Sequence, residues 1–210
     1  MAEELRPIHT AVLEGNTVEV EARVRDALKR GIAPGRILDD GLIPAMRVVG
    51  DQFERGELYI PEMLVAARAM QAGLAVLKPH LSQAGVKAKG KMVIGTAQGD
   101  LHDIGKNLVA MMLEGAGFEV VDLGIDVSAD RFVEAVRDHA PQLVGISALL
   151  TTTMGTMKSV VKSIESSGLR DKVKIMVGGA PVTEAFSRRI GADGYAPDAG
   201  RAVMVAQSLL

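Results

Sequence analysis

The sequence predicts an α/β protein in two parts, a helical bundle followed by a sheet of parallel strands. Residues 3–79 place apolar side chains at helical spacing, whereas residues 91–210 alternate short apolar runs with amphipathic helical segments. At 210 residues, the chain is long enough to bury a core without disulfides or a structural metal. Length alone allows one domain or two.

Four amphipathic helices account for the first part. Asn16 followed by Glu19 resembles a capping box and predicts the start of the second helix. Pro44 lies inside the third apolar pattern, so we expect a kink or a local break there. Short connections between such helices imply a four-helix bundle over residues 1–85. Residues 80–90 lose the periodicity, and we interpret them as a linker.

Five apolar runs in the second part have the length of buried strands. They cover residues 92–97, 118–123, 143–148, 173–177 and 194–196. Helical segments between them imply a parallel sheet that is covered on both faces. With right-handed crossovers, residues 90–210 form a doubly wound, flavodoxin-like domain of five strands. Ligands of such sheets bind beyond the carboxyl ends of the strands, so we expect the functional residues there.

Composition excludes several classes of function. Lys and Arg total 24 against 26 Asp and Glu, and this balance leaves no basic footprint for nucleic acid. The absence of Cys excludes disulfides, thiolate zinc sites and protein-ligated iron–sulfur clusters, and it fits a cytoplasmic protein. We find neither an apolar signal core nor an uninterrupted apolar run of the ~18 residues that a span requires, so we expect no membrane contact.

The loop after the first predicted strand contains Asp100-x-His102-x-x-Gly105. Histidine is the commonest metal ligand, and a ligating His usually donates its second N–H to a carboxylate, for which Asp100 is well placed. The plainer interpretation of an Asp–His pair in a loop is a turn or a helix cap. No second His, Glu or Cys nearby completes a metal site, so a single ligand would suit a metal that is already held by a macrocycle.

Further groups follow the later strands. The hydroxyl-rich segment 147–153 could cap the next helix or face a ligand. Gly178 and Gly179 could form a tight turn or let a flat ligand lie against the backbone. Residues 124–126, after the second strand, lie at the same edge of the sheet. Each signal is weak alone, but three of them on strand ends of one sheet favour a ligand site.

Together, Asp100-x-His102-x-x-Gly105, Ser147-x-Leu149 and Gly178-Gly179 resemble the fingerprint of cobalamin-binding domains. The intervals also match, with 41 residues (106–146) between the first two motifs and 28 (150–177) between the last two. Residues 50–64 are similar to the helical cap of methionine synthase and of methyltransferase corrinoid proteins. The resemblance covers nearly the whole chain. It points to the free-standing corrinoid proteins that serve methyltransferases for methanol, methylamines or methoxylated aromatics.

The resemblance implies roles for individual residues. His102 would be the lower axial ligand of cobalt, with the base of the cofactor displaced, and Asp100 would hydrogen-bond to His102. Thr153 occupies the position at which methionine synthase completes this relay with a serine. The resemblance implies a catalytic role for Asp100, His102 and Thr153. Ser147 would contact the displaced base. The other implied cofactor-binding residues are Gly99, Leu101, Asp103, Ile104, Gly105, Leu149, Thr151, Gly178 and Gly179. Within the cap, the candidates for covering the upper face of the corrin are Tyr59 and Met63.

The implied function is that of a methyl carrier that does not act as an autonomous enzyme. Its cobalamin or related cobamide would accept a methyl group as Co(I) from a substrate-specific methyltransferase. It would then pass the group as methyl–Co(III) to a second methyltransferase, whose acceptor is tetrahydrofolate or a thiol. The linker would act as a hinge for the cap. A homodimer is left open.

Three alternatives also stay open. A cobalamin-dependent mutase subunit shares the three motifs but usually lacks the helical cap. A cobalamin sensor commonly adds a DNA-binding or signalling segment, and we find no basic helix-turn-helix candidate here. A flavodoxin-like protein that binds a nucleotide or nothing would leave the joint spacing of the motifs unexplained.

Overall fold

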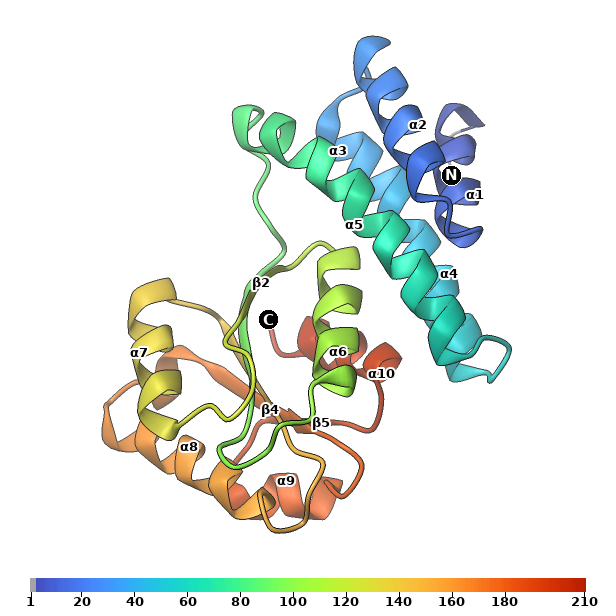
Figure 1. Cartoon of the computed structure of the whole chain (residues 1–210). Coiled ribbons are helices and arrows are strands. Elements are labelled where there is room, and N and C mark those ends of the chain that lie inside the picture. The colour runs from blue at the N-terminus through green and yellow to red at the C-terminus, as the bar shows by residue number, and fades with distance from the viewer. Residues whose placement is uncertain (1–2) are drawn as a thin grey trace. The chain divides into compact units, whose positions relative to one another are not determined.

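The computed structural model describes residues 3–210, except for the side chains of Glu54 and Ser82, and it separates into two compact units. One unit runs to Lys89 and includes Glu114–Gly117, and the other comprises Gly90–Leu113 and Phe118–Leu210. Figure 1 shows the first unit as helices in blue to green and the second as a sheet with its helices in green to red. The domain limits 1–85 and 90–210 stay a prediction, for which an experiment is given below.

The helical unit carries the predicted helices and three shorter segments. Its elements are η1 (Glu3–Leu5), α1 (Arg6–Leu13), α2 (Thr17–Lys29), α3 (Pro34–Arg36), η2 (Ile37–Leu42), α4 (Ile43–Glu54) and α5 (Ile60–Gln83). Asn16 caps α2, because its side chain accepts a hydrogen bond from the Glu19 N–H at 3.1 Å. The reciprocal half of the capping box is absent, since the Glu19 carboxylate instead accepts from Arg23 at 2.8 Å.

The break expected at Pro44 takes the form of a π-helical segment. Element η2 is π-helical, and the N–H of Ile43 bonds to the carbonyl of Leu38, five residues earlier. Pro44 then lies in the first turn of α4. Proline lacks an N–H and crowds the carbonyl four residues before it, so a wider turn accommodates the ring within one continuous run of helix.

Helix α5 continues further than the sequence suggested. It passes through Pro79 and ends at Gln83, so the prediction of a linker from His80 onward is wrong for its first residues. The actual end is formed by Gly85, whose φ of +68° is left-handed, and the Val86 N–H bonds back to the Leu81 carbonyl. A proline costs a helix one hydrogen bond but does not always end it.

Helix α5 is the one helix among residues 3–210 that is long and apolar enough for a membrane span. Residues Ile60–Leu81 have a mean hydropathy of 1.3, which by length and composition alone matches a membrane span. An alanine-rich helix reaches this value although Glu62 and Arg68 interrupt its apolar run. In the helical unit α5 packs against α2 and α4. Its buried residues include Met63, Ala66, Ala67, Ala69, Met70, Gly73 and Leu77, which recur at helical spacing as in a core helix.

The second unit confirms the predicted doubly wound fold. Its strands are β1 (Lys91–Thr96), β2 (Glu119–Asp122), β3 (Leu143–Ser147), β4 (Lys174–Gly178) and β5 (Gly194–Ala196). They pair in parallel in the order β2-β1-β3-β4-β5. The helices are α6 (Ile104–Gly115), α7 (Ala129–His139), α8 (Met154–Ser166), η3 (Arg170–Lys172), α9 (Glu184–Ile190) and α10 (Ala199–Ser208). Figure 1 shows α7, α8 and α9 on one side of the sheet and α6 and α10 on the other.

The register of the sheet aligns the ends of its strands. Thr96 of β1 pairs with Ser147 of β3, Ser147 pairs with Gly178 of β4, and Gly178 pairs with Ala196 of β5. The loops after these strands therefore leave the sheet from a single row. The connection from β1 turns toward β2, whereas β3 lies on its other side, so the switch point of the sheet falls between β1 and β3.

Candidate functional site

Asp100 is completely buried in the loop that follows β1. Its Oδ1 atom accepts the backbone N–H of His102 at 3.1 Å and lies 2.7 Å from His102 Nδ1. Its Oδ2 atom accepts the backbone N–H groups of Leu149 at 2.8 Å and Leu150 at 3.1 Å, and the Thr153 hydroxyl at 2.7 Å. A buried carboxylate requires several hydrogen-bond donors, because burial has removed the water molecules that would otherwise solvate its charge.

These contacts hold Asp100 in its charged form. Burial by itself raises the pKa of this carboxyl, but hydrogen bonds from Thr153, His102 and the Leu149 backbone outweigh burial and bring the pKa well below its usual range. An anionic Asp100 favours the tautomer of His102 that carries its proton on Nδ1. The His102 side chain is 51% exposed, so its Nε2 atom is available to a ligand.

The relay geometry that the resemblance implied is therefore present. Asp100, His102 and Thr153 meet although Thr153 lies 53 residues after Asp100. The methyl group that distinguishes Thr153 from a serine does not prevent the contact, because the hydroxyl still reaches Oδ2. The catalytic part assigned to these three residues stays a prediction, since it depends on the bound cofactor.

Two residues that the sequence did not assign to the site also hold this loop. The buried Thr96 hydroxyl donates to the carbonyl of His102 at 3.0 Å. Asp126 accepts the N–H of Gly99 on Oδ1 at 2.7 Å, and its own N–H donates to the carbonyl of Asp100 at 3.0 Å. The sequence pointed to Asp126 only through the position of residues 124–126 after β2. Nothing in the sequence pointed to a role for Thr96.

Exposed apolar side chains stand on the three loops that meet at Asp100. The loop after β1 contributes Leu101 and Ile104, the loop after β2 contributes Ile125, and the loop after β3 contributes Leu149 and Leu150. Exposed apolar side chains gathered at one place on a protein surface usually mark a site of binding. We call these five side chains the apolar rim.

The residues of this edge fit a planar macrocycle with one protein ligand. A Cβ at Gly105 would meet no atom within 4 Å, so packing does not require this glycine, and the space beside it is open to a ligand. Among residues 3–210, no group of three or more His, Cys, Asp or Glu side chains could hold a metal ion. A metal bound at His102 would therefore need a macrocycle for its other positions, and the apolar rim suits the faces of a flat ring.

The packing of the protein itself requires the glycine pair at the end of β4. A Cβ at Gly178 would lie 2.9 Å from the carbonyl oxygen of Ala196, and one at Gly179 would collide with the carbonyl of Ala148. Gly179 also has a φ of +124°. The close approach of neighbouring strand ends is thus enough to explain both glycines. This agrees with the interpretation of the pair as a tight turn. Ser147 is half-buried in the adjacent strand position. A role of these residues toward a ligand stays a prediction.

Other predicted site residues are placed as follows. Asp103 accepts the Asn107 side-chain amide at 3.0 Å, and the buried Lys106 donates to Asn107 at 2.6 Å and pairs with Asp122. This polar chain ties the loop to β2. Thr151 is exposed in the turn before α8.

In the helical unit, Tyr59 is 72% exposed and Met63 is completely buried. The Glu62 carboxylate accepts the N–H of Tyr59 at 2.8 Å, which fixes the start of α5. Whether either side chain covers a cofactor stays a prediction, and the burial of Met63 also suits ordinary packing.

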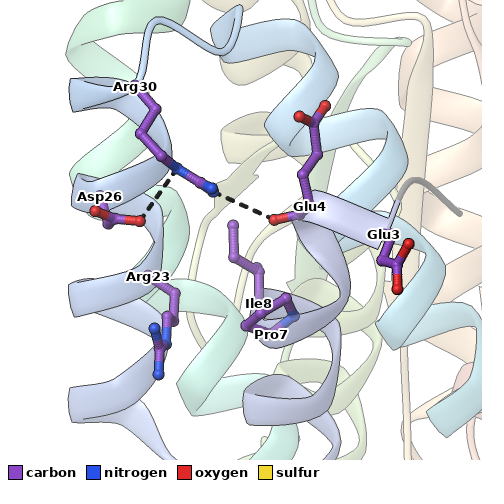
Figure 2. A pocket seen from close by; sticks show the side chains of 7 residues that line it. All are labelled: Glu3, Glu4, Pro7, Ile8, Arg23, Asp26 and Arg30. Carbon is purple, nitrogen blue, oxygen red and sulfur yellow. Dashed lines mark hydrogen bonds and ion pairs between the residues drawn. The ribbon is translucent and has the colours of Figure 1, made fainter.

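A cavity of about 270 Å³ lies elsewhere, in the helical unit (Figure 2). Arg30 bonds there to Asp26 at 3.2 Å and to the carbonyl of Glu4 at 3.3 Å. None of the predicted site residues lines it. We assign no ligand to this cavity.

Fold and site define an α/β protein with a candidate ligand site, which carries one half-exposed histidine, at the β1/β3 switch point. Comparison with known proteins agrees. Residues 90–204 and residues 4–78 each match a B12 binding domain. The dimethylamine corrinoid protein of Methanosarcina barkeri is 45% identical over 207 residues, which cover 98% of this chain and 97% of the relative. Trimethylamine corrinoid protein 1 of Methanosarcina acetivorans is 44% identical over 195 residues, 91% of this chain and 90% of the relative.

Solved structures point the same way. A chain of the methanol:cobalamin methyltransferase complex MtaBC from Methanosarcina barkeri superposes with a TM-score of 0.87 at 33% identity, over 99% of this chain and 79% of that one. A cobalamin-binding protein from Desulfitobacterium hafniense DCB-2 gives 0.81 at 32% identity, over 98% of both chains. The chain belongs to the B12-binding corrinoid proteins of methyltransferase systems, and its cofactor is cobalamin or a related cobalt corrinoid. The resemblance inferred from the three motifs is confirmed.

Proposed function

We propose that this corrinoid protein carries a methyl group between two methyltransferases, and that it binds its cofactor base-off with His102 as the lower ligand of cobalt. The observation that supports this most directly is the half-exposed imidazole of His102, held through Nδ1 by the buried Asp100. When bound, the corrinoid supplies the methyl-transfer chemistry, because its cobalt can accept a methyl group from one partner and release it to the other.

The residues around His102 would tune this ligand. Asp100 keeps a proton on Nδ1 and so makes Nε2 the metal-binding nitrogen. A metal and a proton would compete for the same Nε2 lone pair. Donors from Leu149, Leu150 and Thr153 keep Asp100 anionic in both states. This arrangement supports our hypothesis that ligand exchange is coupled to pH.

Other residues at the strand ends would bind and shield the cofactor. The apolar rim would keep water from the corrin face that lies against the sheet domain. Ser147 and Gly178 lie side by side in the row of strand ends, where the displaced nucleotide tail would enter. Tyr59 is our candidate for the opposite corrin face, and its 72% exposure leaves its ring free for such a contact.

The names of the relatives support a choice of partners. The curated relatives with 44–45% identity serve dimethylamine and trimethylamine, whereas the methanol complex shares 33%. We therefore propose a methylamine methyltransferase as the substrate-specific partner. A second methyltransferase, with tetrahydrofolate or a thiol as acceptor, would take the methyl group. A cytoplasmic location, which the absence of Cys suits, is a further part of this proposal, and the oligomeric state stays open.

The helical unit favours the carrier over a mutase subunit. Residues 4–78 match a B12 binding domain of their own, and a mutase subunit would not require this unit. The two functions differ in the upper ligand that they use. Activity with a methyl-cobamide but not an adenosyl-cobamide would support the carrier, and the opposite preference would support the mutase.

The spectrum of a His102→Gly variant tests the ligand assignment. Apoprotein is incubated with hydroxocobalamin, excess cofactor is removed by gel filtration, and the visible spectrum is recorded. We expect the variant to retain corrinoid but to show a shifted spectrum, because cobalt has lost an axial nitrogen. His139→Gln, at the end of α7, is the matched control and should match the wild type. An unchanged spectrum in His102→Gly would exclude His102 as the lower ligand.

A further inference from the structure

We propose that Asp126 is a positioning residue for the cobalt ligand, because it holds the loop after β1 in the conformation that presents His102. Asp126 lies in the loop between β2 and α7. It is part of neither the Asp100–His102 motif nor the segment after β3 that binds the Asp100 carboxylate. The inference rests on the proposed role of His102 and adds to it a residue that acts through the backbone of the loop.

Asp126 contacts this loop at two successive residues. Its Oδ1 atom accepts the N–H of Gly99 at 2.7 Å, and its backbone N–H donates to the carbonyl of Asp100 at 3.0 Å. The two bonds bracket the segment that leads directly to His102. On either side, the Thr156 hydroxyl bonds to the carbonyl of Gln98 at 3.2 Å, and Thr96 bonds to that of His102. Asp126 therefore provides the central restraint of this backbone.

The conformation of Asp126 is unusual for a residue with a side chain. Its φ is +53°, in the left-handed region that L residues other than glycine, Asn and Asp rarely adopt. Such a conformation persists where its surroundings demand it. Here the left-handed conformation lets both the backbone amide and the carboxylate of Asp126 contact the loop after β1. The next residue, Val127, fixes the β2 loop to the end of β1, because its N–H donates to the carbonyl of Thr96 at 2.9 Å.

Asp100 is consequently held from two sides. The β3 loop binds its carboxylate through Leu149, Leu150 and Thr153, and the β2 loop binds its backbone through Asp126. If the backbone of Asp100 rotated, its fixed carboxylate would no longer meet His102 Nδ1 in the same place. The orientation of the imidazole thus depends on a residue that the cofactor motif does not include.

A positioning role differs measurably from a general contribution to stability. Asp126 is exposed, so removing its carboxylate leaves no cavity in the core. Asp126→Gly keeps the left-handed conformation and removes the acceptor, whereas Asp126→Asn keeps an acceptor oxygen and tolerates the same φ. Asp130→Asn makes the same change of charge in the first turn of α7 and is the matched control.

The experiment measures cobalt ligation and loop opening in the full chain. Each variant is loaded with hydroxocobalamin and reduced to Co(II), where a nitrogen ligand splits each cobalt line of the electron paramagnetic resonance spectrum into three. Hydrogen exchange at the Gly99 amide is followed in the apoprotein. We expect Asp126→Gly to lose this splitting in most molecules and to exchange Gly99 about tenfold faster or more, as the loss of one hydrogen bond requires. Asp126→Asn and Asp130→Asn should resemble the wild type.

Each outcome separates this inference from the proposed function. Unchanged splitting and exchange in Asp126→Gly would overturn the inference and leave the role of His102 intact. Equal losses in Asp126→Asn and Asp126→Gly would also overturn it, because charge and not the hydrogen bond would then matter. Splitting that persists in His102→Gly would instead overturn the proposed function.

Discussion

Asp100 is the residue on which the site depends, because it joins three loops through one buried side chain and its backbone. Its carboxylate has donors from the β1 and β3 loops, and its carbonyl binds the β2 loop. An unpaired buried carboxylate would neutralise itself by taking up a proton. Here the donors keep the charge, so Asp100 can both orient His102 and stabilise the protein.

The charge of Asp100 predicts how stability depends on pH. Its pKa in the folded state is lowered, so the folded state binds fewer protons there than the unfolded chain. The contribution of Asp100 is therefore complete above the unfolded pKa of about 4 and is lost as pH falls toward the folded pKa. We expect the free energy of unfolding of the apoprotein to decline below about pH 4.

Asp100→Asn should flatten this acid decline. At neutral pH the variant should lose about 1–3 kcal/mol, because an amide presents its NH₂ group to donors that had faced a carboxylate. Urea denaturation of the apoprotein between about pH 3 and 7 measures both effects, with Asp130→Asn as the control. An acid decline of equal slope in Asp100→Asn and the wild type would contradict the assignment of the titration to Asp100.

Among the elements, the glycines at the strand ends separate into two kinds. Gly105 opens α6 beside free space, whereas Gly179 follows β4 with no room for a Cβ. The sequence presents both simply as glycines of the three motifs. Only the contacts show that one of them leaves room for something outside the protein and the other serves the fold.

Gly105→Leu should leave the apoprotein folded and abolish corrinoid binding. The added side chain would project into space that is open in this structure and that the macrocycle would occupy. Gel filtration after loading measures retained corrinoid, and circular dichroism measures the Tm. The smaller Gly105→Ala change should retain part of the binding. Full binding by Gly105→Leu would place the macrocycle elsewhere.

Gly179→Ala should act on the fold instead. Its Cβ would collide with the carbonyl of Ala148, and a φ of +124° is open to glycine alone. We expect a loss of at least about 2 kcal/mol in the free energy of unfolding of the apoprotein, measured by urea denaturation. Unchanged stability would show that β3 and β4 separate easily at their ends.

The helices show where local patterns suffice and where they do not. Pro44 was expected to disturb its helix, and it follows a π-helical segment. The linker was expected to begin at His80, yet α5 passes through Pro79 and continues to Gln83. Sequence patterns identify a proline but not the packing that decides whether the helix survives it.

For the whole molecule, the two compact units predict a protease-sensitive connection. Val86 to Lys89 are exposed and outside helices and strands. Limited trypsin digestion should cut first after Lys87 or Lys89, and the fragment that begins near residue 90 should keep corrinoid. Mass spectrometry of the first products checks this, with a Lys87→Gln, Lys89→Gln protein as the resistant control. First cuts inside either unit would contradict the predicted limits of 1–85 and 90–210.

Much of this protein could be predicted before any coordinates. Alternating apolar runs imply parallel strands, crossover handedness restricts their order, and the spacing of Asp100 and His102 implies their hydrogen bond. These features are local, or follow from rules that hold for every sheet of this kind. The three motifs at strand ends were enough for the family and for its cofactor.

Only the tertiary structure revealed the hydrogen-bond donors that keep Asp100 anionic. The same is true of the hydrogen bonds between Asp126 and the β1 loop. Leu149 and Thr153 lie 49 and 53 residues from Asp100, and Asp126 lies 27 residues from Gly99. Their meeting depends on the register between β1 and β3 and on one left-handed residue after β2. Periodicity of side chains sets which face of a strand is buried, but the direction in which a loop amide points is decided by long-range packing.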